Sequence, residues 1–217
     1  KLFVFVLVAA SWQSPVFGQC QSWVGLPNKD ALEEAHVLYR QFIKTEEYDK
    51  AFEYWEKAYK GAPAADGQRS SHFVDGRKIY LHKFKNATDE AKKKEYAANA
   101  LRLFDEQGNC YPNEKALATG LKAYEMFYTI NSPYPDTKKA CQEAIAAGGN
   151  STSYVVFQPY ASIIVWQYQN KQADAAEARE VYTKLNEIAD YNVANNAKQA
   201  DTYKQAKEAM NATFAAI

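Results

Sequence analysis

The hydrophobic positions between residues 30 and 63 recur at steps of three and four, which predicts two amphipathic α-helices joined by a short turn. In the first helix the recurring positions are Leu32, Ala35, Leu38, Tyr39 and Phe42. In the second helix they are Tyr48, Ala51, Phe52, Trp55, Ala58 and Tyr59. Gly61 suits a helix C-terminus, and Pro63 prevents the helix from continuing. The segment therefore predicts a helical hairpin packed through aromatic and alanine side chains.

The order of large and small residues in this hairpin resembles a tetratricopeptide repeat, a helix–turn–helix unit of about 34 residues. The positions that carry the resemblance follow the order large, small, large, small, large, small and proline: Leu38, Tyr39, Phe42, Ala51, Trp55, Ala58 and Pro63. Tyr39 departs from the family pattern, which usually has glycine or alanine there. The resemblance implies stacked helical hairpins, and an ordinary helical hairpin is the alternative.

The rest of the chain repeats the helical pattern less regularly. We expect further hairpins at about residues 69–107, 113–148 and 153–189, and a last helix at 195–217. The helix that begins at Glu114 is expected to pack through Leu117, Leu121, Tyr124 and Tyr128. Residues 153–169 are almost wholly apolar and include Trp166, and Pro159 within them predicts either a kink or a helix that begins at Pro159. Residues 30–217 are therefore predicted to form one all-α domain, a right-handed α-α superhelix (solenoid) of about four helical hairpins plus a terminal helix.

Residues 1–18 have the pattern of a secretory signal peptide. An apolar run from Leu2 to Ala10 follows a single lysine and is too short to span a membrane. Val16 and Gly18 occupy the −3 and −1 positions of a cleavage site. We therefore expect an exported protein, in the periplasm or on the outer-membrane surface, in which residues 19–29 form an extended lead-in to the first hairpin.

The chain has three cysteines, which permit one disulfide and leave an odd thiol. We expect either a bond between Cys110 and Cys141, which would clamp neighbouring hairpins, or three unpaired thiols. Cys20 could instead be the lipidated residue of a bacterial lipoprotein, and membrane association is expected only in that case. Gln19 disfavours that processing, because the residue before the lipidated cysteine is normally small.

Neither the composition nor the motifs of the sequence indicate a catalytic site. The 26 basic and 26 acidic residues balance, which argues against a nucleic-acid partner, since phosphate binding needs a positive surface. No nucleophile elbow, Walker loop or HExxH motif occurs, and the three histidines are isolated from one another. No cluster of histidine and cysteine has the spacing of metal ligands. We therefore expect no catalytic, cofactor or metal site, and a protein that is not an enzyme.

Function is then expected to come from the surface of the superhelix. In the resembling family the first helix of each hairpin lines a concave face that grips peptides or helices. Carried over to the first hairpin, this places His36, Arg40 and Lys44 on the exposed stripe. Such a basic stripe could accept a carboxylate or an acidic segment, because arginine offers a bidentate fork. Ordinary solvent exposure of these three side chains is the alternative.

The main hypothesis is a non-enzymatic scaffold that mediates protein–protein interaction, with a protein or peptide partner, in the bacterial cell envelope. A glycan- or small-ligand-binding module of the outer membrane is the second hypothesis. It rests on Tyr111, Tyr134 and Tyr154, which are expected in loops and could stack on sugar rings. The third hypothesis is the non-catalytic part of a longer enzyme.

Overall fold

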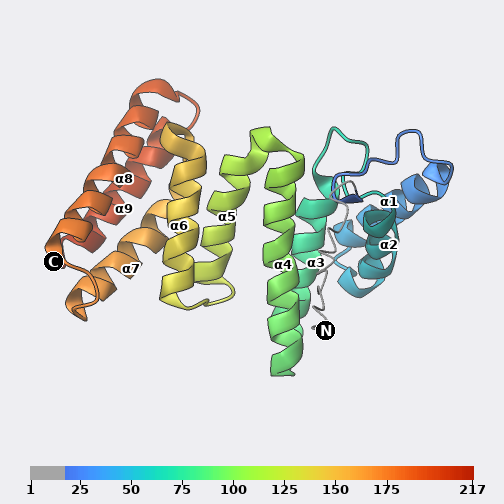
Figure 1. The fold of residues 1–217 in the computed structure, drawn as a ribbon, viewed down its shortest axis with the longest axis horizontal. Coiled ribbons are helices and arrows are strands. Elements are labelled where there is room, and N and C mark those ends of the chain that lie inside the picture. Colours follow the sequence, from blue (N-terminus) through green and yellow to red (C-terminus); the bar gives the residue numbers. More distant parts are fainter. Residues whose placement is uncertain (1–17) are drawn as a thin grey trace, which may run out of the picture.

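A computed structural model of the chain describes residues 18–217, and within that range it contains nine α-helices and no β-strand. In chain order these are α1 Lys29–Lys44, α2 Tyr48–Gly61, α3 Ser71–Asn86, α4 Glu90–Cys110, α5 Lys115–Tyr128, α6 Tyr134–Gly148, α7 Phe157–Gln169, α8 Ala175–Asn195 and α9 Ala200–Phe214. The all-α prediction is confirmed, and the helices follow one another in a superhelical array (Figure 1). The predicted signal peptide, apart from Gly18, lies outside the described residues.

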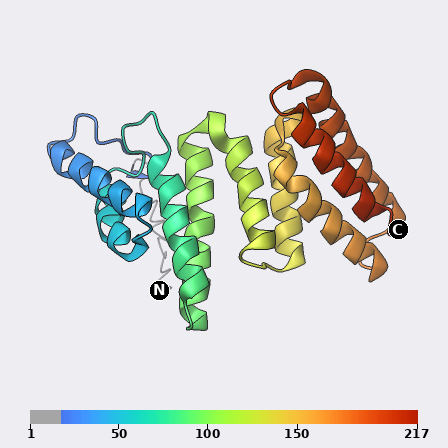
Figure 2. The ribbon, with the colours of Figure 1, turned by 180° about the vertical axis from the view of Figure 1, so that it is seen from behind.

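The first six helices form three successive hairpins, in which α1 packs on α2, α3 on α4 and α5 on α6. Contacts between α4 and α5 join the second hairpin to the third. The last three helices differ from the predicted hairpin at 153–189, because α8 packs mainly on α9, and α7 contacts α9 more extensively than it contacts α8. Seen from behind, α9 lies in front of α8 (Figure 2). The apolar helix α7 therefore packs against α6, α8 and α9 rather than against a single hairpin partner.

Trp55 and Gly76 fix the contact between the first two hairpins. Trp55 is 1% exposed, and its ring stacks on Tyr59 with the ring centroids 4.8 Å apart. The indole Nε1 donates a hydrogen bond of 2.7 Å to the carbonyl oxygen of His72. A Cβ atom on Gly76 would lie 2.3 Å from Cζ2 of Trp55 and 2.8 Å from Cδ1 of Leu103. Helix α3 can therefore pass between α2 and α4 because position 76 carries no side chain.

The lead-in, residues 18–28, is fastened to the ends of these two hairpins. Cys20 forms a disulfide with Cys110, at the C-terminal end of α4. The backbone N–H of Trp23 donates to the carbonyl oxygen of Ala65 at 2.9 Å, and the Trp23 side chain is buried. The predicted lead-in thus covers one end of the array, as an irregular segment without α-helix.

The expected Cys110–Cys141 bond is wrong. Cys141 is a free and buried thiol that packs in the hydrophobic core of α5 to α9, whereas Cys110 lies beside the lead-in. The disulfide also occupies the Cys20 sulfur atom to which a lipid would be attached. Among the described residues, no helix is both long enough and apolar enough to cross a bilayer.

We expect Gly76→Ala to lower the free energy of unfolding by about 1–3 kcal/mol, because the added methyl group overlaps the Trp55 ring. This loss exceeds the gain in helix propensity, which is at most about 1 kcal/mol. Urea unfolding followed by circular dichroism measures the change. The matched control is Gly108→Ala, whose Cβ would lie 3.2 Å from Cγ of the flexible Lys115 side chain and at an ordinary 3.5 Å from its Cα and Cβ, and which should be much less destabilising. Equal stability of the two variants would contradict this packing.

We expect Cys20→Ser to lower the free energy of unfolding by about 4 kcal/mol, because the bond closes a loop with a sequence separation of 90 residues. Denaturant titration of the oxidised protein measures this loss. Counting reactive thiols in denaturant should give one for the wild type and two for the variant. The pairing would be refuted by peptide mapping that finds Cys110 linked to Cys141.

Candidate functional site

Helix α5 buries a face of small residues and exposes a stripe of large apolar ones. Its buried residues are Ala118, Gly120, Ala123 and Met126. Leu117 is 51%, Tyr124 36% and Tyr128 46% exposed, and Leu121 is half-buried. The prediction that these four large side chains pack into the core is therefore wrong. Both faces of α5 are apolar, and the closely packed interior takes the face with the smaller side chains.

Aromatic rings continue this stripe from α5 towards α6 and α7. The rings of Tyr124 and Tyr128 have centroids 4.7 Å apart, and Phe127 links Tyr128 to Tyr134. Tyr134 meets Trp166 edge to face at 5.0 Å. Trp166, which the sequence places in an apolar helix, is 41% exposed. We name the following set the inner aromatic strip: Leu117, Leu121, Tyr124, Tyr128, Tyr134 and Trp166.

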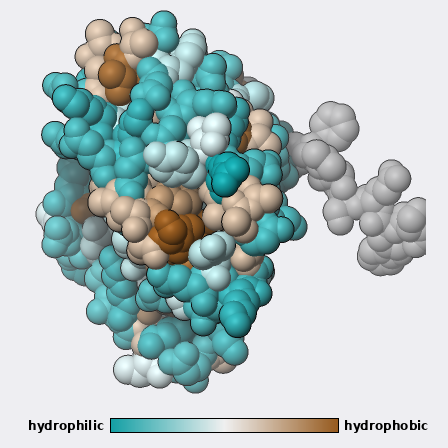
Figure 3. All heavy atoms as spheres, turned by 90° about the vertical axis from the view of Figure 1, so that its left-hand side faces the viewer, coloured by the Kyte–Doolittle hydropathy of each residue, from teal (hydrophilic) through white to brown (hydrophobic). Residues whose placement is uncertain are grey.

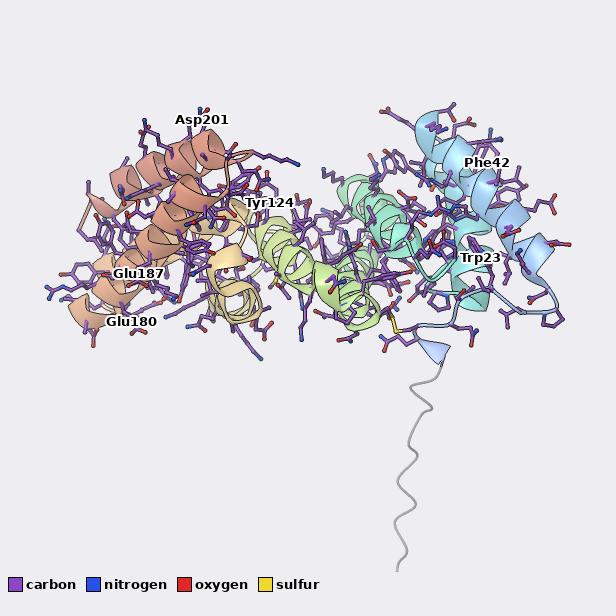
Figure 4. All side chains as sticks on the ribbon, turned by 90° about the horizontal axis from the view of Figure 1, so that it is seen from above. Trp23, Phe42, Tyr124, Glu180, Glu187 and Asp201 are labelled. Carbon is purple, nitrogen blue, oxygen red and sulfur yellow. A yellow bond between two sulfur atoms is a disulfide. The ribbon has the colours of Figure 1, made fainter. Side chains whose placement is uncertain are left out.

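The α5 part of the strip includes Tyr124, which lies on the concave side of the curved array. Viewed from above, the two ends of the molecule reach forward on either side of α5, and Tyr124 lies on the inner side of the curve (Figure 4). The positions 117, 121, 124 and 128 are spaced by four, three and four residues, so their side chains share one side of the helix over about 16 Å. That spacing is also the spacing of a coiled-coil seam, and here three of the four side chains remain 36–51% exposed.

Two lysines near the strip are already paired. The Nζ atom of Lys122, on α5, lies 2.7 Å from Oδ1 of Asp105 on α4. Lys138, on α6, forms an ion pair with Glu177 on α8 and donates a hydrogen bond of 3.0 Å to Gln167. The strip therefore offers mainly ring faces and aliphatic surface, which suit an apolar ligand segment.

The three residues predicted to bind a partner do not form a free basic stripe. His36 is half-buried, with Nδ1 3.0 Å from Nε2 of His72 and its ring packed edge-on against Trp23 at 5.2 Å. The Nε atom of Arg40 lies 3.6 Å from Oδ2 of Asp75. Lys44 is exposed at the end of α1. Partner binding by these residues stays a prediction, although their geometry assigns His36 to internal packing.

His36 and His72 belong to a polar cluster beneath the lead-in. His72 is 0% exposed, and its Nδ1 lies 2.8 Å from the carbonyl oxygen of Ala62. The two hydrogen bonds of His72 are satisfied together when Nδ1–H donates to Ala62 and Nε2 accepts from His36. The hydroxyl of Tyr39 donates to Oδ2 of Asp75 at 3.2 Å. The cluster thus joins α1, α3 and the lead-in through neutral imidazoles and one buried carboxylate.

Burial sets the protonation of this cluster. It lowers the pKa of His72 to about 4, although the hydrogen bond to Ala62 acts in the opposite direction. Burial, assisted by the positive charge of Arg40, also lowers the pKa of His36. The pKa of Tyr39 is raised by burial and by the neighbouring Asp75 carboxylate. At neutral pH both histidines are therefore uncharged and serve as hydrogen-bonding parts of the core.

Two of the three tyrosines predicted to be exposed in loops are used for packing. The hydroxyl of Tyr111 donates to the carbonyl oxygen of Ala64 at 2.7 Å. The ring of Tyr154 packs edge to face on Tyr203 at 5.4 Å. Tyr134 belongs to the inner aromatic strip. In the part of the chain that the structure describes, no three histidine, cysteine or acidic side chains gather at a distance suited to a metal ion.

We expect the folded protein to lose stability as the pH falls from about 6.5 to about 4. His72 titrates near 6.5 when unfolded and at about 4 when folded, so the unfolded chain binds the proton first. The stabilisation is fully present above pH 6.5 and amounts to about 3 kcal/mol. Urea midpoints across this range measure it. His72→Asn should reduce the change of the urea midpoint with pH, and the control His82→Gln should not. If both variants keep the wild-type dependence on pH, His72 is not the group responsible.

Comparisons with known proteins add no relative to this geometry. No protein-family model matches the chain, and no curated protein or solved structure matches it. The likeness to the tetratricopeptide repeat therefore rests on the residue pattern of the first hairpin.

Proposed function

We propose that the protein is a non-enzymatic helical-repeat scaffold that binds a partner protein through the inner aromatic strip. One observation carries the proposal: α5, in the middle of the curved array, exposes leucine and tyrosine side chains where a solvated helix would expose polar ones. Neighbouring exposed apolar side chains on a folded protein commonly mark an interaction surface.

The composition of the strip supports a protein partner. Tyrosine and tryptophan supply a large share of the binding energy in protein interfaces, and they act best near the centre of the contact. Here Tyr124 lies on the inner side of the curved array, where a partner would be surrounded on two sides, and the exposed ring of Tyr128 lies beside it. The coiled-coil spacing on α5 favours a partner segment that packs as a helix along the stripe.

The proposal includes an exported, oxidising location in the bacterial cell envelope. The Cys20–Cys110 disulfide supports an oxidising compartment, because structural disulfides are rare where cellular reductants keep thiols reduced. The signal-peptide pattern of residues 1–18 supports export.

A glycan is the second candidate ligand for the same surface. Tyr128 and Trp166 are 46% and 41% exposed, which leaves ring area available for stacking on a sugar. The packing of Tyr111 and Tyr154 removes two of the three rings on which this hypothesis first rested. A protein partner therefore explains more of the strip, including its leucines.

We expect a double variant, Tyr124→Ser with Tyr128→Ser, to weaken partner binding at least tenfold, because each aromatic anchor contributes about 2 kcal/mol or more. The partner would be isolated from envelope extract by cross-linking and mass spectrometry, and its affinity measured with purified components. The fold should survive, since both side chains lie at the surface.

The matched control replaces two exposed tyrosines elsewhere, Tyr54→Ser with Tyr191→Ser, and should retain the affinity. A partner bound equally well by both double variants would refute the role of the strip. A glycan-array signal that is lost with Tyr134→Ala, in the absence of any protein partner, would favour the second candidate.

A further inference from the structure

A second hollow lies at the C-terminal end of the array, where α7, α8 and α9 meet. It has a volume of about 450 Å³, which is within the range of small-molecule pockets. Its walls are mainly aromatic and aliphatic: Tyr168, Ala178, Tyr182, Phe214 and Ile217. Figure 3 faces this end of the molecule and shows apolar residues gathered at its centre, with hydrophilic residues around them.

Arg179 is the one charged residue that lines this hollow. The other arginines of the chain have partners: Arg40 pairs with Asp75, Arg69 with Asp66 and Arg102 with Glu106, and Arg77 donates to Gln107. Within residues 18–217, by contrast, the side chain of Arg179 is exposed and forms neither an ion pair nor a hydrogen bond. An uncompensated guanidinium beside an apolar wall favours a ligand that brings its own negative charge.

Two partly exposed tyrosines also line the hollow, Tyr168 at 37% and Tyr182 at 40% exposure. The hydroxyl groups of Tyr168 and Tyr182 make no hydrogen bond in the described part of the chain, whereas the amide of Asn211 is already bonded to Asn186 at 3.1 Å. Phenol hydroxyls can donate to a carboxylate that the guanidinium holds. The polar capacity of the site is therefore that of an anion receptor, and the remaining walls suit a hydrocarbon chain.

We propose that this hollow binds an amphiphilic carboxylate, with the carboxylate on Arg179 and the aliphatic chain against Phe214 and Tyr182. A cationic amphiphile would meet a like charge, and a neutral one would leave the guanidinium unused. The hollow is separate from the inner aromatic strip, so this binding activity stands independently of the proposed scaffold function.

The test uses octanoate and the full chain, with binding measured by calorimetry and saturation-transfer NMR. We expect octanoate to bind. We expect 1-octanol, which has the same chain length but no charge, to bind about tenfold more weakly, because the loss of one ion pair worth roughly 1.4 kcal/mol lowers the affinity by that factor. Arg179→Gln should reduce octanoate binding to the level of 1-octanol.

Lys184→Gln is the matched control, because it removes a positive charge from the same helix outside the hollow, where Lys184 pairs with Glu187. It should leave octanoate binding unchanged. Ala215→Trp, at an exposed position in the lining, should fill the hollow and abolish binding of both ligands. Circular dichroism confirms the fold of each variant.

Two results would overturn the proposal. One is the absence of octanoate binding at millimolar concentration. The other has two parts: the wild type binds octanoate and 1-octanol with equal affinity, and Arg179→Gln changes neither affinity. That result would show apolar adsorption without recognition of the carboxylate.

Discussion

The contact of Trp55 with Gly76 is the constraint on which the N-terminal half of the molecule depends. The indole fills the space that position 76 leaves open, and its N–H holds the carbonyl of His72. Together these two contacts set how deeply α3 lies against α2 and how it is rotated. That rotation points the His72 imidazole at His36. Buried polar groups are tolerated only when they are paired, so the histidine cluster requires the geometry that the tryptophan imposes.

The helical periodicity of the sequence was sufficient to predict the all-α class and most helix positions. The second helix, for example, ends at Gly61 as expected from the glycine and the following proline. Periodicity could not decide which face of α5 lies inside, since Ala118 and Ala123 alternate with Leu117 and Tyr124 and both sets are apolar. The alanine face is the buried one because the neighbouring helices lie too close to α5 to accommodate the larger side chains. The largely apolar α7 poses the same problem, and contacts with α6, α8 and α9 resolve it by covering several sides of the helix.

The candidate site was harder to predict than the fold. His36 follows the spacing of an exposed stripe, but the lead-in, which has no counterpart in the repeat pattern, places Trp23 over it. Arg179 resembles any solvated helix residue in the sequence, and only the structure shows that it lines an apolar hollow and forms no ion pair within residues 18–217. A disulfide between distant residues, such as Cys20–Cys110, likewise cannot be predicted from a local sequence pattern, because three cysteines allow more than one pairing.

The placement of Cys141 protects the covalent bond at the other end of the molecule. Its burial raises the pKa of the thiol to about 12, so almost no thiolate is available at neutral pH to attack a disulfide. In the folded protein the core of α5 to α9 therefore keeps the free sulfur away from thiol–disulfide exchange, and the Cys20–Cys110 pairing is preserved.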